Sequence, residues 1–224
     1  MKYRDLTDVV NEIEDKISKF KIKKIVFWES NILVNYQNHL KLLLKMIIKR
    51  GLKATLSFPE GFNPNLLNHN LLQLMKAAGV KDIMLSLETI NPEIAVKRFS
   101  SESKAGTFRN IIKIIKELKF EGTIAAFILA GLPRQDTDEV RKAIDFSIDL
   151  GAIPSIMPFT PIPGTLEFRN CYSVIKGKSL EDLHPFLWPC VTKRRIYDKF
   201  CKIHSDCLKD ICKLLKTYEK RRIL

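Results

Sequence analysis

The hydrophobic positions of this chain alternate between two spacings. Stretches with apolar residues three or four positions apart predict amphipathic helices over residues 4–20, 36–50, 64–78, 107–120 and 136–150. Short apolar runs predict strands over residues 25–28, 52–58, 81–87, 123–129 and 153–157. Gly51, Gly79 and Gly151 stand directly after three of the predicted helices, where glycine commonly ends a helix.

The predicted helices and strands follow one another with little sequence between them. This order is typical of a parallel sheet whose strands are joined by right-handed helical crossovers, so we predict an α/β fold, as an open sheet or as a barrel. The strands are apolar throughout, as expected where both faces of a sheet are covered. The series begins with a helix. Because such a helix normally follows a strand that it packs against, we expect a strand ahead of residue 4 to be missing.

The pattern changes after residue 168. We expect residues 1–168 to form the α/β part, residues 169–192 an irregular connector, and residues 193–224 a basic amphipathic helix. The chain has a net charge of +13, and residues 193–224 hold eleven Lys or Arg against four Asp or Glu, which is +7. Such a segment fits an anionic partner, but the solvated face of a helix in a lysine-rich chain is the simpler interpretation.

Composition narrows the class of protein. Hydrophobic residues make up 46% of the chain, which is enough for a packed core. The first twenty residues are too polar for a secretory signal, and no apolar run approaches the roughly 20 residues of a membrane helix. We therefore expect a cytoplasmic protein without a membrane partner.

All five cysteines lie from Cys171 onward, and their odd number favours free thiols. Cys201 and His204 stand one helical turn apart and would be able to share a metal ion, and Cys207 and Cys212 follow. Cys207 lies on the apolar stripe of the predicted helix, where cysteine behaves as a small hydrophobic residue. Packing is therefore the expected role of these residues.

Ligands of parallel α/β folds gather at the carboxyl ends of the strands. Three of these ends carry a glutamate, namely Glu29, Glu60 and Glu88. Such a carboxylate binds an ammonium group or ribose hydroxyls, or acts as a base. Gly131 follows the strand over residues 123–129, and glycine lets the backbone approach a flat ligand closely. The chain contains neither GxGxxG nor GxxxxGK[ST], so these modes of phosphate binding are not supported.

Three motifs follow one another along the chain. They are LSLE at residues 85–88, FILAGLP at residues 127–133 with Asp138-Glu139 beyond it, and FTPIPGT at residues 159–165. In this order and at this spacing they resemble the radical SAM superfamily, and most closely its methylthiotransferase-like and cobalamin-associated branches. The resemblance covers about residues 4–168.

The resemblance implies an incomplete parallel (βα)6 barrel, that is, a partial TIM barrel, whose second to sixth strands are the five predicted here. It also implies S-adenosylmethionine as a cofactor. Ser86 and Glu88 would end the fourth strand, with Glu88 near the ribose or the amino group of the cofactor. Glu29 would stand where many members have a stretch that meets the methionyl amine.

The same resemblance assigns the next two strand ends to the adenine. The stretch with Ile128, Ala130 and Gly131 would contact the ring through its backbone. Pro158 and Thr160 would lie at the end of the sixth strand, beside the adenine or the substrate.

The family also holds a [4Fe–4S] cluster with a CxxxCxxC loop after its first strand. No cysteine precedes Cys171, so the cluster ligands and the first strand are absent together. We expect a fragment of a radical SAM enzyme, inactive alone, whose parent reaction cleaves S-adenosylmethionine to a 5′-deoxyadenosyl radical and takes hydrogen from an unknown substrate. A partner chain or a missing amino-terminal segment would complete the barrel.

Two alternatives stay open. The first is a non-enzymatic module, derived from the same barrel, that binds a ligand, RNA or an acidic partner. The second is a cofactor-free lyase on a TIM-like barrel with Glu88 as its base.

Overall fold

The computed structural model describes residues 3–92, 104–130, 137–160, 162–170, 172, 176–177 and 179. The basic helix predicted over residues 193–224 lies outside this part of the chain, together with all five cysteines, Gly131 and most of the predicted connector. None of the helices in the described ranges combines the length and the apolar composition of a membrane span.

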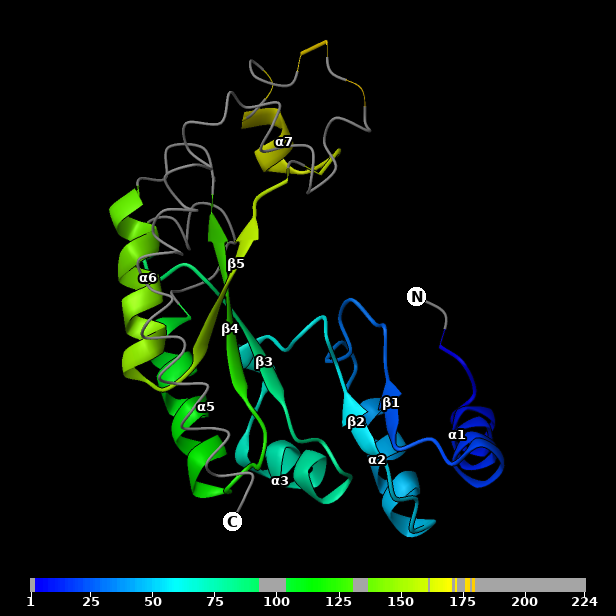
Figure 1. Cartoon of the computed structure of the whole chain (residues 1–224). Coiled ribbons are helices and arrows are strands. Elements are labelled where there is room, and N and C mark those ends of the chain that lie inside the picture. The colour runs from blue at the N-terminus through cyan, green and yellow to red at the C-terminus, as the bar shows by residue number, and fades with distance from the viewer. Residues whose placement is uncertain are drawn as a thin grey trace. The chain divides into compact units, whose positions relative to one another are not determined.

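Helices and strands alternate along the described chain (Figure 1). The α-helices are α1 (Leu6–Phe20), α2 (Leu40–Lys49), α3 (His69–Ala77), α5 (Ala105–Glu117), α6 (Thr137–Asp149) and α7 (Leu166–Asn170), and a 3₁₀ helix η1 (Pro64–Leu66) precedes α3. The strands are β1 (Lys24–Val26), β2 (Thr55–Ser57), β3 (Ile83–Glu88), β4 (Ile124–Ala130) and β5 (Ile153–Pro158). Each strand follows a helix, as the sequence predicts.

The single helix predicted over residues 64–78 is wrong, because two elements stand there. Pro64 starts the 3₁₀ turn η1, which ends at Leu67 in an extended conformation. The side chain of Asn68 then accepts a hydrogen bond from the N–H of Leu71 at 3.0 Å. This capping interaction starts α3 at His69 and separates it from the turn.

Helix α1 is fixed by its two ends and by one apolar stripe. The Asp5 carboxylate accepts hydrogen bonds from the N–H groups of Thr7 at 2.8 Å and Asp8 at 3.3 Å, which caps the first turn. Val10 and Ile13 on its inner face are buried. The helix ends at Lys21 in the left-handed conformation, and residues 21–23 lead directly into β1.

The strands are neighbours in the order in which they occur along the chain. β1 pairs in parallel with β2, and a second sheet has the order β3-β4-β5. Two isolated parallel bridges, Leu56 with Val80 and Phe62 with Leu85, lead from β2 to β3. The predicted α/β fold with parallel strands is therefore confirmed. The finer prediction, a (βα)6 barrel without its first strand, stays a prediction.

The chain divides into two compact units. Unit 1 holds residues 1–86 and 107–125, and unit 2 holds residues 87–106 and 126–224. The core of unit 1 includes the buried side chains Leu40, Leu43, Leu44, Ile47, Leu56, Phe62, Leu72, Met75, Ile83, Leu85 and Phe108. The core of unit 2 includes Leu87, Ala126, Ile128, Ala130, Val140, Ala143, Ile144 and Ala152.

Strands β3 and β4 alternate between buried and half-buried side chains, although their sequences are almost entirely apolar. In β4, Ala126, Ile128 and Ala130 are buried, whereas Phe127 and Leu129 are half-buried. Because successive side chains of a strand point to opposite faces, one face is packed more tightly than the other. Both faces of these strands are thus covered, but to different degrees.

The turn from α5 into β4 depends on Gly122 and gives a test of the packing. A Cβ atom at Gly122 would lie 2.5 Å from the Lys81 carbonyl oxygen and would also meet the Asp82 carboxylate. We expect Gly122→Ala to lower the free energy of unfolding by about 1–3 kcal/mol, because this turn is already filled. Urea denaturation measures the change.

Gly106 provides the matched control, because a Cβ atom there would meet nothing within 4 Å and the residue lies in α5. Gly106→Ala should leave the free energy of unfolding unchanged or slightly increased, since alanine favours helix. Equal stability of the two variants would contradict the packing described for Gly122.

Candidate functional site

The carboxyl end of β3 in unit 2 turns sharply at a predicted site residue. Glu88 has φ +63°, and the N–H of Thr89 donates to the carbonyl of Leu87 at 2.8 Å across it. This is a three-residue γ-turn with a left-handed centre, which a residue other than glycine adopts at a cost of about 1–3 kcal/mol. The strain means that surrounding contacts hold Glu88 in place.

One of these contacts is an ion pair with Lys104. The Lys104 Nζ lies 2.7 Å from the Glu88 Oε1, and the exposed fractions of the two side chains are 10% and 23%. Lys104 directly precedes α5, so the amino end of that helix fixes its position. A pair with so little solvent is held far more firmly than a surface pair, because a lost partner would leave a largely desolvated charge.

A second polar link continues from Thr89, which is buried. The Thr89 hydroxyl accepts a hydrogen bond from the N–H of Asn91 at 3.1 Å, which closes a tight turn. The Asn91 side-chain amide donates to the Glu139 carboxylate of α6. The residues after β3 are therefore joined by hydrogen bonds to the first turn of α6.

The ends of β4 and β5 lie in the same unit. The side chains of Ile128 and Ala130 are on the buried face of β4, so only their backbone is available to a ligand. The Ala130 carbonyl accepts a hydrogen bond from the N–H of Phe159 at 2.8 Å. Pro158 ends β5, and the hydroxyl of Thr160 just beyond it is buried without a hydrogen-bond partner among the described residues.

Ser86 and Glu29, the two other predicted site residues, belong to unit 1. Ser86 is half-buried on the same side of β3 as Glu88, and its N–H donates to the Phe62 carbonyl at 2.9 Å. Glu29 follows β1 and lines a groove that also contains His39. Burial lowers the pKa of the His39 ring, and the Glu29 carboxylate opposes this effect.

Sequence reasoning missed Lys104, Asn91 and the role of Glu139. Lys104 lies 16 positions after Glu88 in the chain, and no helical or strand spacing links the two residues. Asn91 stands before Pro92, which signals a turn but not its partner. Only the tertiary structure brings these side chains to the end of β3.

Comparison with protein families identifies the family of the chain. The model of the family described as the radical SAM superfamily matches residues 1–147, which is 147 of the 224 residues. The chain belongs to the radical SAM superfamily. The resemblance drawn from the three motifs is thereby confirmed. A comparison with curated proteins gives no match.

Solved radical SAM enzymes share the fold. The radical S-adenosylmethionine methyltransferase TsrM from Kitasatospora setae, with cobalamin and a [4Fe–4S] cluster bound, has a TM-score of 0.62 at 20% sequence identity, over 76% of this chain and 35% of TsrM. The same enzyme with its tryptophan substrate and a cofactor analogue has a TM-score of 0.63 at 19% identity, over 76% and 34%.

Coproporphyrinogen III oxidase (HemN) from Escherichia coli, a radical SAM enzyme, has a TM-score of 0.55 at 15% identity, over 83% of this chain and 44% of its own. The chain therefore spans less than half the length of these solved chains. At such identities the likeness concerns the fold and not the reaction.

The two groups that accompany this family differ in how well the described residues fit them. For S-adenosylmethionine, unit 2 of this radical SAM protein offers the Glu88 carboxylate and the unpartnered Thr160 hydroxyl. For a [4Fe–4S] cluster, the described residues include no cysteine and no group of three or more His, Cys, Asp or Glu placed to hold a metal ion.

Removal of Lys104 tests whether the pair holds the end of β3. We expect Lys104→Met to lower the free energy of unfolding by about 2 kcal/mol, because the Glu88 carboxylate is left half-buried without its partner. The double variant Glu88→Gln/Lys104→Met should recover much of the loss, since it leaves no unpaired charge. Thermal and urea denaturation at neutral pH measure both variants.

Lys81, which pairs with Glu121 at 2.8 Å on the surface, is the matched control. Its side chain and that of Glu121 are 48% and 70% exposed, so Lys81→Met should have no measurable effect on stability. A Lys104→Met variant as stable as Lys81→Met would show that Lys104 does not hold Glu88.

Proposed function

We propose that this chain forms the S-adenosylmethionine-binding part of a radical SAM enzyme, which cleaves the cofactor reductively to a 5′-deoxyadenosyl radical and takes a hydrogen atom from a substrate. Membership of the superfamily supports the class of reaction. The strained and ion-paired Glu88 carries the proposal within the structure. A carboxylate held in this way at the end of a strand is ready for a ligand before the ligand arrives.

The proposal gives a role to five residues of unit 2, namely Glu88, Lys104, Ile128, Ala130 and Thr160. The Glu88 carboxylate accepts hydrogen bonds from ribose hydroxyls or from the cofactor amino group, and Lys104 keeps it oriented. The backbone of Ile128 and Ala130 forms the surface against which the adenine packs, since their side chains face the core. The Thr160 hydroxyl has no hydrogen-bond partner among the described residues, and in this proposal it forms a hydrogen bond with the ligand.

The electron for cofactor cleavage comes, in this family, from a [4Fe–4S] cluster. The sequence contains no CxxxCxxC, and its five cysteines all lie from Cys171 onward. We therefore propose that the three thiolate ligands come from polypeptide other than these 224 residues, and that these residues alone bind the cofactor without cleaving it. The role of this chain is then to bind and orient the adenosyl group.

Binding of S-adenosylhomocysteine, measured by isothermal titration calorimetry, tests this function. We expect saturable binding that Glu88→Gln weakens about tenfold or more, because a charged hydrogen-bond acceptor is lost. Glu121→Gln, which changes an exposed glutamate of unit 1, is the control and should bind as the unchanged chain does. No binding by the unchanged, folded chain would contradict the proposal.

Reconstitution with iron and sulfide under anaerobic conditions tests the second part. We expect no [4Fe–4S] signal in electron paramagnetic resonance and no 5′-deoxyadenosine. Detection of both the cluster signal and 5′-deoxyadenosine would show that this chain holds its own cluster. That result would overturn the proposed origin of the thiolates.

A second candidate function is favoured by the distribution of charge. Residues 193–224 carry +7 of the net charge of +13, which suits binding of RNA or another anionic partner by a non-enzymatic module. Binding of a single-stranded RNA probe should then weaken steeply as the salt concentration rises. Absence of binding at low salt would exclude this candidate.

A further inference from the structure

A small cavity of about 170 Å³ lies in unit 1, at the amino ends of α2 and α3. Two leucines and five polar residues line it, and the polar ones are Tyr36, Gln37, Lys41, Asn68 and Asn70. The cavity is smaller than the roughly 300–1,000 Å³ of pockets for drug-sized ligands, so it suits a ligand of a few atoms. None of the residues that line it is acidic.

Two side-chain amides beside the Tyr36 hydroxyl have fixed orientations. The Lys41 Nζ lies 3.0 Å from the Gln37 Oε1, and because an ammonium group only donates, the amide oxygen of Gln37 faces Lys41. The Asn68 Oδ1 accepts a hydrogen bond from the N–H of Leu71, as the cap of α3. Both side chains therefore turn their NH₂ groups toward the Tyr36 oxygen, which lies 2.7 Å from the Gln37 nitrogen and 3.3 Å from the Asn68 nitrogen.

These two contacts decide how the Tyr36 hydroxyl meets a ligand. A hydroxyl oxygen has two lone pairs, and here each of them accepts an amide N–H. The hydroxyl is then left with its proton, so it acts toward a further group only as a donor. Among the described residues no acceptor takes this proton. Because Tyr36 lines the cavity, the donor is available to a ligand there.

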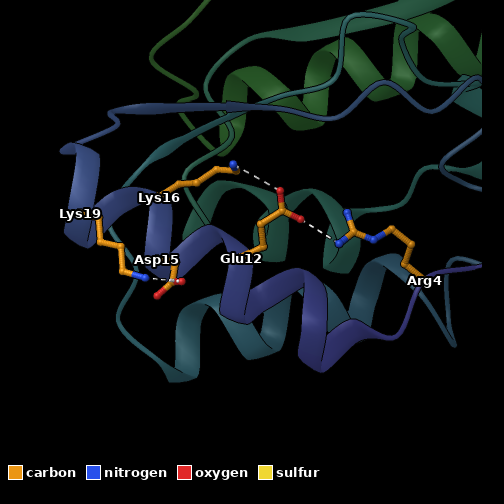
Figure 2. Close-up of polar contacts among 5 residues, drawn as sticks. All are labelled: Arg4, Glu12, Asp15, Lys16 and Lys19. Atoms are coloured by element: carbon orange, nitrogen blue, oxygen red, sulfur yellow. Dashed lines mark hydrogen bonds and ion pairs between the residues drawn. The ribbon is translucent and has the colours of Figure 1, made fainter.

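The charge of Lys41 is not compensated by a carboxylate among the described residues. Figure 2 shows the usual arrangement on α1, where the Glu12 carboxylate lies between Arg4 at 2.8 Å and Lys16 at 3.4 Å. Lys41 instead contacts the neutral amide of Gln37 with one of its three N–H groups. Its positive charge and its other two donors are therefore available beside the Tyr36 hydroxyl.

The position of Lys41 also argues against a role in helix stability. Lys41 is the second residue of α2, and the amino end of a helix already carries a partial positive charge. A cation there is unfavourable, and α2 has no acidic residue in its first turn to offset it. The first turn of α3, which contributes Asn70 to the cavity, has no acidic residue either. Positive charge thus gathers at this cavity without a negative counterpart in its lining.

We propose that this cavity binds a small monocarboxylate with a short aliphatic chain. The carboxylate accepts a hydrogen bond from the Tyr36 hydroxyl and pairs with the Lys41 ammonium group, both of which line the cavity. The aliphatic chain packs on Leu71, which is buried, and on Leu74, which is half-buried. The residues of this site take no part in the binding proposed for S-adenosylmethionine, so the inference goes beyond the proposed function.

The balance of charge and apolar surface favours a carboxylate over a phosphate. Lys41 is the one cation in the lining, so it matches a single negative charge, whereas a phosphate dianion would keep an uncompensated charge. Two leucines would also lie against the phosphate oxygens without donating to them. A carboxylate turns its charged end to Lys41 and Tyr36 and leaves the leucines to its carbon chain.

Butyrate is the probe, and butyramide, which has nearly the same shape without the charge, is the comparison. We expect butyrate to shift the side-chain amide signals of Gln37 and Asn68 in proton–nitrogen correlation NMR spectra of the full chain. The shifts should saturate with a Kd of about 1 mM, since few contacts are made. Butyramide and inorganic phosphate should each bind at least about tenfold more weakly, because neither matches both Lys41 and the leucines.

Two variants remove the two donors separately. Lys41→Met and Tyr36→Phe should each weaken butyrate binding about tenfold, because each loses a hydrogen bond to a charged group. Both should keep the thermal unfolding profile, since Gln37 and Asn68 are exposed and water replaces the lost contacts. Lys45→Met, which removes an exposed cation of α2 outside the cavity, is the control and should bind butyrate as the unchanged chain does.

The same chemistry occurs in a free acid and at the carboxyl terminus of a peptide. Acetyl-glycyl-valine, titrated beside butyrate, distinguishes these two sources. Binding of this peptide that is no tighter than that of butyrate would support a free acid. Binding tighter by about tenfold or more would overturn the assignment to a small molecule and give the site to a peptide terminus.

Three further results would overturn the proposal. They are the absence of saturable shifts when butyrate is added to the folded chain, equal affinity for butyrate and butyramide, and unchanged affinity in a folded Lys41→Met variant. These titrations contain no S-adenosylmethionine and no iron, so their failure is distinct from failure of cofactor binding.

Discussion

Parallel strands cannot be joined by short turns, and this constraint organises the whole chain. Each strand must be followed by a segment that returns to the starting end, and here helices do this between every pair of strands. All strands then end on the same side of their sheet, which is where Glu88, Ala130 and Thr160 stand in unit 2. Within the described residues, β2 is the one strand that pairs with β1.

The end of β3 shows how strain and charge support each other. A left-handed glutamate is unfavourable by itself, and so is a largely desolvated ion pair with imperfect contacts. In this chain the two occur at one residue, and the Lys104 contact at 2.7 Å sets the position that the γ-turn requires. The γ-turn, for its part, leaves the carboxylate in contact with Lys104. Rigid geometry at Glu88 thus arises from two features that are each costly alone.

The fold could be predicted from the sequence because it depends on local signals. Apolar spacing and terminal glycines such as Gly51 and Gly151 identify helices and strands in the correct order. Their boundaries depend on capping. The Asn68 cap, for example, starts α3 at His69, whereas the apolar spacing predicts a helix from residue 64. Burial was less predictable, since apolar residues such as Phe127 and Leu129 fit a half-covered face as well as a core.

The candidate site was predictable only in part. Glu88 was visible in the sequence because a single acidic residue ends an apolar strand. Lys104 and Asn91 were not, since their roles depend on contacts between segments far apart in the chain. Thr160 was found through its motif, but the burial of its hydroxyl is a property of the folded unit.

The ion pair at Glu88 also determines what kind of ligand the residue can accept. A ligand that approaches it meets a carboxylate already neutralised by Lys104, so the two side chains together form a dipole and not a bare charge. In the proposed complex, a ribose hydroxyl donates to this paired carboxylate without adding a charge, and Lys104 keeps its contact with Glu88. The affinity that such a hydrogen bond provides depends little on ionic strength.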